Sequence, residues 1–338
     1  MCAVMWIWSG FIKYSQTMIE GHGDDAYRYG DIKNDFSSNI CAHNHHQALM
    51  NHLMAHPELI SHYPEPEAWS LETIIADRYG LHPQQVIVTS GATEAIYLIA
   101  QTFRMQSEIP SPTFSEYEDA CQLFPPSSDK TMLWLCNPNN PTGEVYAPSY
   151  IKRMVAVYDL VVLDQSYENY TDAQVMSPQE GCLIPNVIQI HSMTKTYGVP
   201  GLRLGYITAH ESLTAKIRQY LRPWSVSALA LEAGKFLLQH DELICKPDLQ
   251  EAKRLAKRLE ELPDIEVTPT QTNFMLCRMK QHTAAELKDY LAGEHRMLIR
   301  DASNFRSLTP YHFRMASQTP AENDALVEAI KQFISRNG

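Results

Sequence analysis

Short apolar runs alternate with helical patterns along the first two thirds of the chain. The runs, each of strand length, lie at residues 86–88, 132–135, 160–163 and 187–190. A helical pattern through Ile96, Ile99 and Phe103 follows the first run. Strands that alternate with helices indicate a mostly parallel sheet with helices on both faces. We therefore predict a large α/β domain built around such a sheet.

The last third of the chain has a different pattern. Residues 229–262 are rich in helical patterns, and short strand-like runs follow at residues 272–277 and 311–316. A closing helix is expected over residues 321–334. This mixture predicts a smaller α+β domain that is able to close over a site on the larger one.

These patterns divide the chain into segments. We assign residues 18–62 to an N-terminal arm and part of the small domain, residues 63–225 to the large domain, and residues 226–338 to the C-terminal small domain. Residues 1–17 are interpreted as an extension or an upstream mis-start. They contain no basic segment and no small-residue cleavage site, so a signal peptide is not expected.

Composition narrows the classes of partner. The chain has 338 residues, 44% of them hydrophobic, which is enough to bury the cores of two domains. Its formal net charge of −11 argues against a nucleic acid or an anionic membrane as partner. No run approaches the roughly 18 apolar residues of a membrane helix. Seven cysteines at no paired or metal-site spacing predict a reducing, cytoplasmic location.

Lys195 stands in a polar motif just after the run at residues 187–190. Ser192 and Thr194 precede this lysine, and Arg203 follows it. A lysine amine in such a place can form a Schiff base with pyridoxal phosphate (PLP), while hydroxyls and a guanidinium hold the phosphate of the cofactor. An isolated lysine after a strand is more often a surface residue, so this interpretation depends on the motifs upstream.

Asp164 ends the run at residues 160–163, where open α/β sheets place their ligands. PLP needs a carboxylate beside its pyridine nitrogen, because the protonated ring is the stronger electron sink. Tyr167, three residues further on, is placed to reach the phenolic oxygen of the cofactor. By itself Asp164 fits a helix cap or a turn equally well.

Two further motifs follow the remaining runs. Residues 137–143 (NPNNPTG) form a rigid loop whose side-chain amides can point at a ligand. Residues 90–95 (SGATEA) join a strand to a helix and present backbone N–H groups to a phosphate. Asn-Pro turns and Gly-Ala turns are common individually, but the four motifs in this order together indicate a PLP site.

With these motifs the chain resembles fold-type I PLP enzymes of the class I/II aminotransferase superfamily, from about His22 to the C-terminus. The resemblance implies that Lys195 carries the Schiff base and that Asp164 pairs with the ring nitrogen. It also implies that Phe114 stacks on the ring, and that Asn140 and Tyr167 bind the phenolic oxygen.

The same resemblance implies a set of contacts to the cofactor phosphate. The residues that it places there lie in the motifs that follow two strands: Ala92, Thr93, Ser192, Thr194 and Arg203. Tyr63 resembles the tyrosine that crosses from a partner subunit to the cofactor phosphate. The resemblance therefore implies an obligate homodimer with shared active sites.

Within the superfamily, several strings are similar to threonine-phosphate decarboxylases: residues 21–24 (GHGD), 35–40 (DFSSNI), 112–118 (PTFSEYE), 223–230 (PWSVSALA) and 299–305 (IRDASNF). Histidinol-phosphate aminotransferases share the cofactor residues but usually lack the first and fourth of these strings. The resemblance implies a small substrate that carries a carboxylate, a phosphate or both. The resemblance implies substrate contacts from His22, Asn140, Arg300 and Arg314, with Arg314 on the carboxylate, since an arginine fork matches either anion.

The chain departs from the family pattern in three places. Residues 41–46 (CAHNHH) replace the usual Asn-Pro-Leu-Gly near the substrate, which leaves the identity of the substrate open. Thr113 and Asn137 are only 24 positions apart, fewer than is usual, so a strand of the large domain is expected to be short or absent. Gln165 replaces an acidic residue, a change from which we expect little effect.

Three hypotheses for function remain at this point. The decarboxylase-like strings favour a lyase acting on a phosphorylated amino acid, in which the carboxylate leaves the α-carbon. If a proton leaves instead, Lys195 acts as acid and base, and the enzyme is an aminotransferase of the histidinol-phosphate or aromatic amino acid type. A PLP-binding protein without catalysis is the third hypothesis, against which the complete set of site residues argues.

A histidine cluster lies outside these motifs and comprises His43, His45, His46, His52 and His56. His45, His52 and His56 can share one helical face. However, no cysteine or carboxylate accompanies them at the spacing of a zinc site. We interpret the cluster as a solvated or locally packed helix face and predict no metal site.

Overall fold

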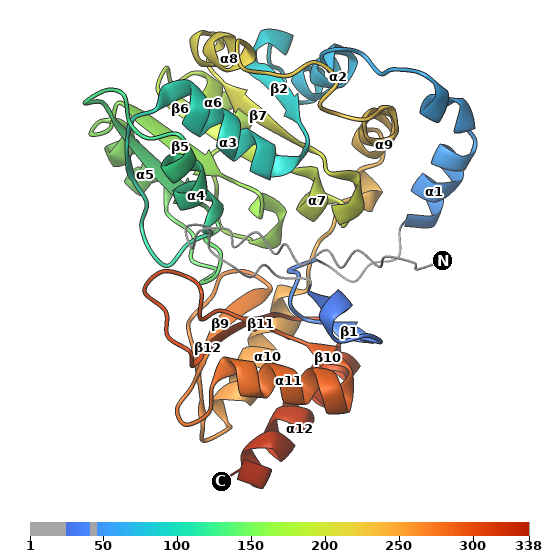
Figure 1. Cartoon of the computed structure of the whole chain (residues 1–338), viewed down its shortest axis with the longest axis vertical. Coiled ribbons are helices and arrows are strands. Elements are labelled where there is room, and N and C mark those ends of the chain that lie inside the picture. The colour runs from blue at the N-terminus through green and yellow to red at the C-terminus, as the bar shows by residue number, and fades with distance from the viewer. Residues whose placement is uncertain (1–24, 41–45, 338) are drawn as a thin grey trace, which may run out of the picture.

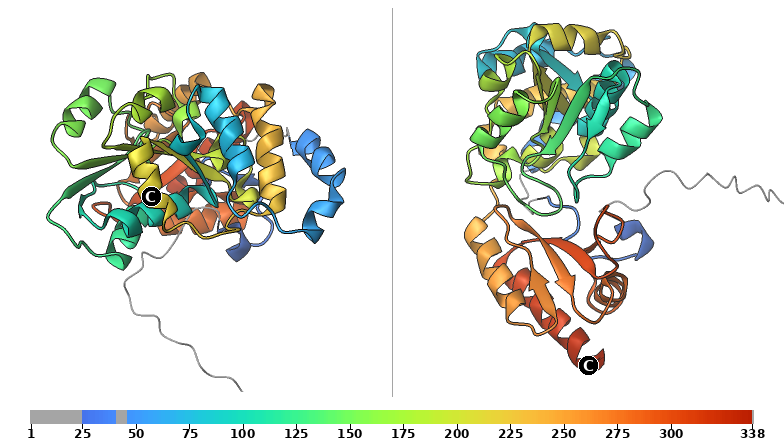
Figure 2. Two further views of the ribbon diagram at one scale, coloured as in Figure 1. Left: turned by 90° about the horizontal axis from the view of Figure 1, so that it is seen from above. Right: turned by 90° about the vertical axis from the view of Figure 1, so that its left-hand side faces the viewer.

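The computed structural model describes residues 25–40 and 46–337. It consists of two stacked bodies, the larger around a six-stranded sheet and the smaller around a four-stranded sheet (Figure 1; Figure 2). His22 and residues 41–45 lie outside the described residues, and so does residue 338.

The large sheet confirms the predicted α/β class. Its strand order is β2-β7-β6-β5-β4-β3, and neighbouring strands are parallel except that β7 runs antiparallel to β2 and β6. The four apolar runs of the sequence lie in β2, β4, β5 and β6. The strand bounds are β2 (Val86–Thr89), β3 (Gln106–Glu108), β4 (Thr131–Cys136), β5 (Leu160–Asp164), β6 (Val187–Ser192) and β7 (Gly205–Ala209).

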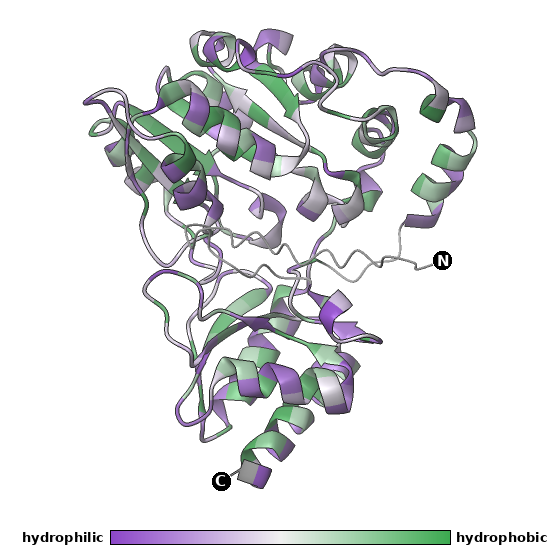
Figure 3. Cartoon of the chain, in the orientation of Figure 1, coloured by the Kyte–Doolittle hydropathy of each residue, from purple (hydrophilic) through white to green (hydrophobic). Residues whose placement is uncertain are grey.

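Helices cover both faces of this sheet. Met132 and Trp134 of β4 pack toward α3, α4 and α8, whereas Leu133 and Leu135 pack toward α5. Successive strand residues point to opposite faces, so a continuous apolar run is buried on both sides. Figure 3 shows these apolar strands between helices whose outer faces are polar. The helix bounds are α2 (Trp69–Tyr79), α3 (Gly91–Phe103), α4 (Glu116–Leu123), α5 (Pro148–Val155), α6 (Pro178–Cys182), α8 (Glu211–Arg218) and α9 (Ala228–Leu238).

Helix α9 packs with the large sheet. Leu231 and Leu237 share one buried core with Leu71 of α2 and Val88 of β2. The core of the large body therefore extends past residue 225, where the sequence pattern placed the start of the small domain. The apolar face of α9 predicts a helix, but only the packed structure decides which sheet that face covers.

The smaller body contains the expected late strands and the closing helix. Its antiparallel sheet has the order β11-β12-β9-β8, and α10, α11 and α12 bury their apolar faces against it. The bounds are β8 (Ile265–Val267), β9 (Phe274–Met279), β11 (Arg300–Asp301), β12 (His312–Ala316), α10 (Leu249–Glu260), α11 (Ala284–His295) and α12 (Pro320–Asn337). Among the described residues no helix is long and apolar enough to cross a membrane.

The N-terminal arm connects the two bodies. Strand β1 (Asn34–Asp35) pairs in parallel with β10 (Met297–Leu298) of the smaller body. Helix α1 (His46–Met54) then packs against α9 of the larger body. The remaining short elements are η1 (Ala26–Arg28), η2 (Pro57–Ser61), η3 (Pro83–Gln85), η4 (Glu168–Tyr170), α7 (Met193–Thr196), η5 (Pro200–Leu202) and η6 (Asp241–Leu243).

The short segment between Thr113 and Asn137 contains α4 and β4. The described chain forms no additional strand between these two elements, and β3 is the edge of the large sheet. This arrangement agrees with the expectation of a short or absent strand.

Candidate active site

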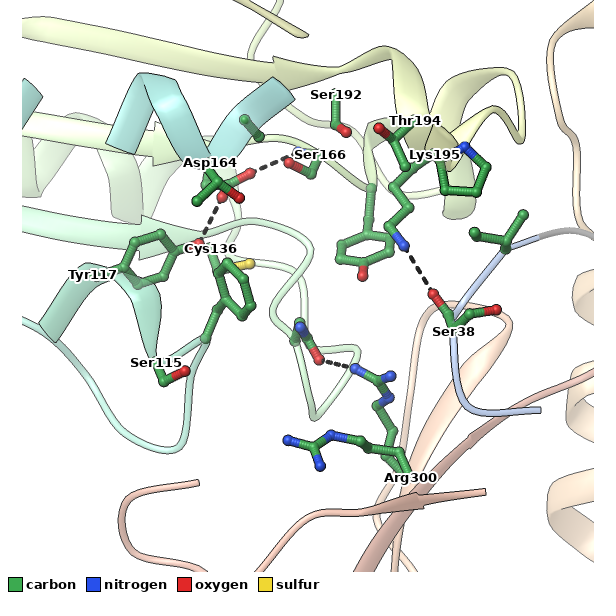
Figure 4. Close-up of a pocket in the computed structure, with 18 of the residues that line it drawn as sticks. Ser38, Ser115, Tyr117, Cys136, Asp164, Ser166, Ser192, Thr194, Lys195 and Arg300 are labelled. Atoms are coloured by element: carbon green, nitrogen blue, oxygen red, sulfur yellow. Dashed lines mark hydrogen bonds between the residues drawn. The ribbon is translucent and has the colours of Figure 1, made fainter. Parts of the chain in front are cut away.

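A cavity of about 300 Å³ lies between the two bodies, at the carboxyl ends of β4, β5 and β6 (Figure 4). This is the edge at which parallel sheets place their ligands, and the volume suits a small molecule. The sequence-predicted residues that line it come from separate motifs: Ala92, Thr93, Phe114, Asn140, Asp164, Tyr167, Ser192, Thr194, Lys195, Arg203, Arg300 and Arg314.

Lys195 extends from α7 into the cavity. Its Nζ donates a 2.8 Å hydrogen bond to the carbonyl oxygen of Ser38 in the N-terminal arm and lies 5.7 Å from the centroid of the Tyr167 ring. The hydroxyl of Tyr170 donates a 2.9 Å hydrogen bond to the Lys195 backbone carbonyl, which fixes the short helix. A half-buried amine is thus presented to the cavity from a fixed backbone.

Asp164 ends β5 with its carboxylate almost fully buried. One oxygen accepts a 2.7 Å hydrogen bond from the Tyr117 hydroxyl, and the other accepts a 2.9 Å hydrogen bond from the Ser166 backbone N–H (Figure 4). Burial raises the pKa of Asp164, while the hydrogen bonds from Ser166 and Tyr117 oppose that rise. A cationic N–H facing this carboxylate would favour its ionised form.

Tyr117 was not assigned a role from the sequence, although it lies in a motif that carries the family resemblance. It is buried on α4, and burial together with the charge of Asp164 holds its pKa well above the usual range. It therefore remains a neutral hydrogen-bond donor. Its ring meets the Phe114 ring edge to face, with centroids 5.8 Å apart, and so also supports the side chain expected to stack on the cofactor.

Arg314 is a buried cation at the opposite side of the cavity. Its Nη1 donates a 2.5 Å hydrogen bond to the amide oxygen of Asn140, and its Nη2 donates to the Ser37 carbonyl oxygen. Among the described residues its Nε has no hydrogen-bond partner, and burial lowers the pKa of Arg314. In the described part of the chain no carboxylate forms an ion pair with it. An anion entering the cavity would supply that missing charge.

Arg300 lies beside Arg314, because the two residues are paired in register on β11 and β12. Its Nη2 donates a 2.8 Å hydrogen bond to Asn304 Oδ1, and its guanidinium lies over the Phe305 ring. Burial, and then the neighbouring charge of Arg314, lower the pKa of Arg300 to about 10. Two adjacent guanidinium groups in one cavity favour a ligand with more than one negative group.

The start of α3 forms a further part of the cavity wall. Gly91 has a φ of +82°, and a Cβ at this position would come within 2.8 Å of Arg203 Nη2. Glycine therefore allows the Arg203 guanidinium to lie against the helix start. Ala92 and Thr93 follow Gly91 in the first turn of α3, whose first N–H groups and positive dipole end favour an anion such as a phosphate.

Some predicted residues are not brought to the cavity. Tyr63 is 86% exposed and contacts Trp224 at a ring-centroid distance of 5.4 Å, so it does not line the cavity of its own chain. Gln165, which was noted only as a departure from the family pattern, also points elsewhere, since its amide donates a 2.8 Å hydrogen bond to the Met176 carbonyl oxygen. The predicted contact of His22 falls outside the described residues, as does most of the segment 41–46.

Other lining residues were missed by the sequence analysis: Ser38, Ile40, Ser115, Tyr117, Cys136, Ser166, Pro200, Asn304 and Phe305. Several of them lie within strings that carry the family resemblance. Ser38 and Ile40 could not have been found from the spacing of the motifs, because they reach the cavity only through the path of the N-terminal arm.

A comparison with protein families identifies the family of the chain. The model of aminotransferase class I and II matches residues 31–125 and 124–330. The chain belongs to this family. The family resemblance and the PLP-dependent chemistry expected from the sequence are thereby confirmed, and the chain is a PLP-dependent enzyme.

Related proteins include threonine-phosphate decarboxylases. The crystal structure of L-threonine-O-3-phosphate decarboxylase from Porphyromonas gingivalis is 37% identical, with a TM-score of 0.85, and the match covers 90% of this chain and 100% of that chain. The threonine-phosphate decarboxylase of Salmonella typhimurium is 26% identical over 89% of this chain and 91% of its own length.

An aminotransferase shares the same fold. Histidinol-phosphate aminotransferase from Sinorhizobium meliloti, whose crystal structure is a complex with pyridoxal-5'-phosphate, is 17% identical with a TM-score of 0.79. The match covers 98% of this chain and 100% of that chain. At this identity the likeness concerns the fold alone.

The cavity has the donors and acceptors that PLP requires. The buried Asp164 carboxylate can accept from a protonated ring nitrogen, and the Lys195 amine is presented to the same space. Arg203, held against Gly91 at the start of α3, offers a cationic end for a phosphate. The residues present therefore fit this cofactor.

Proposed function

We propose that this enzyme is a decarboxylase of a phosphorylated amino acid, acting on a substrate of the threonine-phosphate type. The observation that carries the proposal is the register pair Arg300 and Arg314, two buried cations in one cavity. A substrate with a carboxylate and a phosphate provides one anion for each guanidinium. The similarity to threonine-phosphate decarboxylases supports the same assignment.

The cofactor is proposed to be held by separate residues at its ring nitrogen, its ring face, its phenolic oxygen and its phosphate. Asp164 accepts from its ring nitrogen, Phe114 stacks on its ring, and Asn140 and Tyr167 bind its phenolic oxygen. The phosphate is held by residues at two strand ends: Ala92, Thr93, Ser192, Thr194 and Arg203. When bound, PLP supplies the electron sink for the electron pair that remains when a bond at the substrate α-carbon breaks.

The side chains of the chain determine what happens around that bond. Arg314 binds the substrate carboxylate and sets its direction, while Arg300 binds the distal phosphate together with His22, which lies outside the described residues. Lys195 receives or returns the proton at the α-carbon and is the general acid and base of the reaction. In a decarboxylation, the direction that Arg314 gives the carboxylate would select the bond between the α-carbon and the carboxyl carbon for cleavage; carbon dioxide would leave, and Lys195 would supply the proton that replaces it.

An aminotransferase is the second candidate function. The sequence similarity to histidinol-phosphate aminotransferases favours it, as does the altered segment at residues 41–46. In that case Arg314 would hold the carboxylate in a direction that leaves its bond to the α-carbon intact, and Lys195 would remove the proton from the α-carbon.

We also propose a homodimer in which Tyr63 enters the site of the partner subunit. Tyr63 is 86% exposed and lies next to Trp224, itself 49% exposed, with Trp69 at 54% on the same segment. Exposed aromatic side chains of this size mark interfaces more often than solvent-facing surface. A tyrosine that does not line the cavity of its own chain is available to complete the cavity of a second copy.

The proposal extends to domain motion and location. The large PLP-binding domain and the C-terminal small domain are proposed to close on the substrate, since the small one carries Arg300 and Arg314. The cysteines of the described residues are free thiols, which suits a reducing cytoplasm.

One experiment separates the two functions. The purified enzyme with PLP is incubated with L-threonine O-3-phosphate, and carbon dioxide release is measured beside 2-oxoglutarate-dependent formation of a keto acid. We expect carbon dioxide without any requirement for 2-oxoglutarate. Keto-acid formation that depends on 2-oxoglutarate would overturn the decarboxylase in favour of the aminotransferase.

A further inference from the structure

Two histidines and a glutamate meet on the outer side of the larger body. His52 lies on α1, His56 follows one turn later, and Glu232 lies on the neighbouring α9 (Figure 1). One ligand atom from each of the three residues lies within 4.8 Å of the other two. None of the three residues lines the active-site cavity.

Glu232 supplies the carboxylate that the sequence near the two histidines does not provide at the spacing of a zinc site. Glu232 is 180 positions from His52 in the chain, so no local spacing could associate them. In the fold, α1 packs against α9 and places His52 Nε2 2.8 Å from Glu232 Oε1. Both side chains are about three-quarters buried, with exposed fractions of 24% and 23%.

Packing fixes the orientation of the His52 ring. It stacks on Phe236, one turn after Glu232 on α9, with ring centroids 4.5 Å apart. The His56 ring also lies close to the His52 ring, with centroids 4.7 Å apart and the two planes tilted by 46°. Because these neighbours pack against its ring, His52 presents Nε2 to Glu232 without a large loss of side-chain freedom on binding a ligand.

His56 is held in the tautomer that binds metals. Its Nδ1 is 2.8 Å from the backbone carbonyl oxygen of His52. A carbonyl oxygen can only accept, so Nδ1 carries the proton and a neutral His56 has its lone pair on Nε2. A backbone carbonyl on the second ring nitrogen is the usual orienting contact of metal-binding histidines.

We propose that His52, His56 and Glu232 form a zinc site that fastens α1 to α9. Two imidazoles and one carboxylate are a donor set suited to Zn²⁺, whereas Mg²⁺ and Ca²⁺ prefer oxygen ligands alone. Tetrahedral Zn²⁺ with ligand distances of about 2.0–2.1 Å requires small rotations of the three side chains. The partial exposure leaves room for water as the fourth ligand.

The role of the metal is structural. Helix α1 continues from the N-terminal arm, whose residues Ser38 and Ile40 line the active-site cavity. A metal that joins α1 to α9 would fix α1 to the larger body, and α1 follows the arm in the chain. A plain hydrogen bond between His52 and Glu232 would pack the same helices without any affinity for metal, and this alternative is what the experiment distinguishes.

The test uses the PLP-bound enzyme after chelator treatment and dialysis. Zn²⁺ is titrated by calorimetry, and Co²⁺ is titrated by its visible absorption, which reports tetrahedral coordination. The variants are Glu232→Gln, which keeps a hydrogen-bonding group at the same place, and His56→Gln. The matched control is His240→Gln, because His240 stacks on the same Phe236 ring at 4.0 Å but is not one of the three ligands.

We expect one Zn²⁺ per chain in the unchanged enzyme and in His240→Gln, with a Zn²⁺-dependent rise of Tm in both. Glu232→Gln and His56→Gln should bind at least about 10-fold more weakly and lose the Co²⁺ spectrum. Cofactor absorbance and circular dichroism in chelator check that each variant is folded. Equal Zn²⁺ affinity in all four proteins, or no binding by the unchanged enzyme at micromolar Zn²⁺, would overturn the proposal.

Discussion

The hydroxyl of Tyr117 donates a 2.7 Å hydrogen bond to the carboxylate of Asp164, and both groups are buried. This contact joins α4 to the end of β5 and directs the carboxylate toward the cavity. It couples the protonation of Asp164 to a tyrosine that remains neutral. The position of Asp164, the proposed partner of the cofactor ring nitrogen, therefore depends on Tyr117, which lies in another motif.

Replacing Tyr117 by phenylalanine should shift the pH profile of the enzyme. The Tyr117 hydrogen bond lowers the pKa of Asp164, so its loss raises that pKa. As the pH falls, the Asp164 carboxylate then becomes protonated at a higher pH than in the unchanged enzyme. The acidic limb of the kcat/KM profile therefore shifts to higher pH. We expect a decrease of about 10-fold on that limb, equivalent to about 1.4 kcal/mol.

Tyr97→Phe is the matched control, because Tyr97 donates a 2.9 Å hydrogen bond to Glu116 away from the cavity. Its kcat/KM profile should coincide with that of the unchanged enzyme. Coincident profiles for Tyr117→Phe and Tyr97→Phe would show that the Asp164 contact has no part in positioning.

Lys195→Ala should abolish both the visible absorbance of the bound cofactor and the activity. The amine is the proposed attachment point and the proposed proton carrier, so we expect a decrease in kcat of at least about 100-fold. Absorption spectra and single-turnover assays measure the two effects. Lys152→Ala, on the exposed side of α5, should change neither. Retention of a borohydride-reducible cofactor absorbance in Lys195→Ala would contradict the assignment.

Arg300→Ala should reduce the preference for a phosphorylated substrate. A charge-assisted contact to the phosphate contributes about 1.5–3 kcal/mol, or about 10- to 150-fold in kcat/KM. We expect the ratio of kcat/KM for L-threonine O-3-phosphate over L-threonine to fall by that factor, with little change in PLP affinity. Arg278→Ala, an exposed arginine on β9, is the control. An unchanged ratio would show that residues other than Arg300 bind the phosphate of the substrate.

Two inactive variants should regain activity when they are combined. Tyr63→Ala and Lys195→Ala, mixed and allowed to exchange subunits, form a heterodimer in which one site contains both Lys195 and a Tyr63 from the partner. We expect activity to appear in the mixture and sedimentation to give a dimer. If the mixture stays inactive although the subunits exchange, Tyr63 does not act across the interface.

The sequence identified the cofactor side of the cavity because the cofactor motifs are local, whereas Phe114, Arg300 and Arg314 were assigned only through the family resemblance. Asp164, Ser192 and the loop at residues 137–143 follow apolar runs, and parallel strands bring their carboxyl ends to one edge. Strand periodicity and topology rules therefore predict that these residues lie near each other. The late strands and the closing helix of the small domain were likewise visible as a change in pattern, but the pattern did not show that α9 belongs with the large sheet.

The tertiary structure decided the contacts between residues distant in the chain. The Tyr117–Asp164 hydrogen bond, the Arg300–Arg314 register pair and the Ser38 carbonyl at Lys195 depend on helix packing, strand pairing and the path of the arm. Helix α9 covers the large sheet, and Glu232 meets His52, for the same reason. Periodicity shows which face of an element is apolar, but the partner of that face is chosen by the packing of the whole chain.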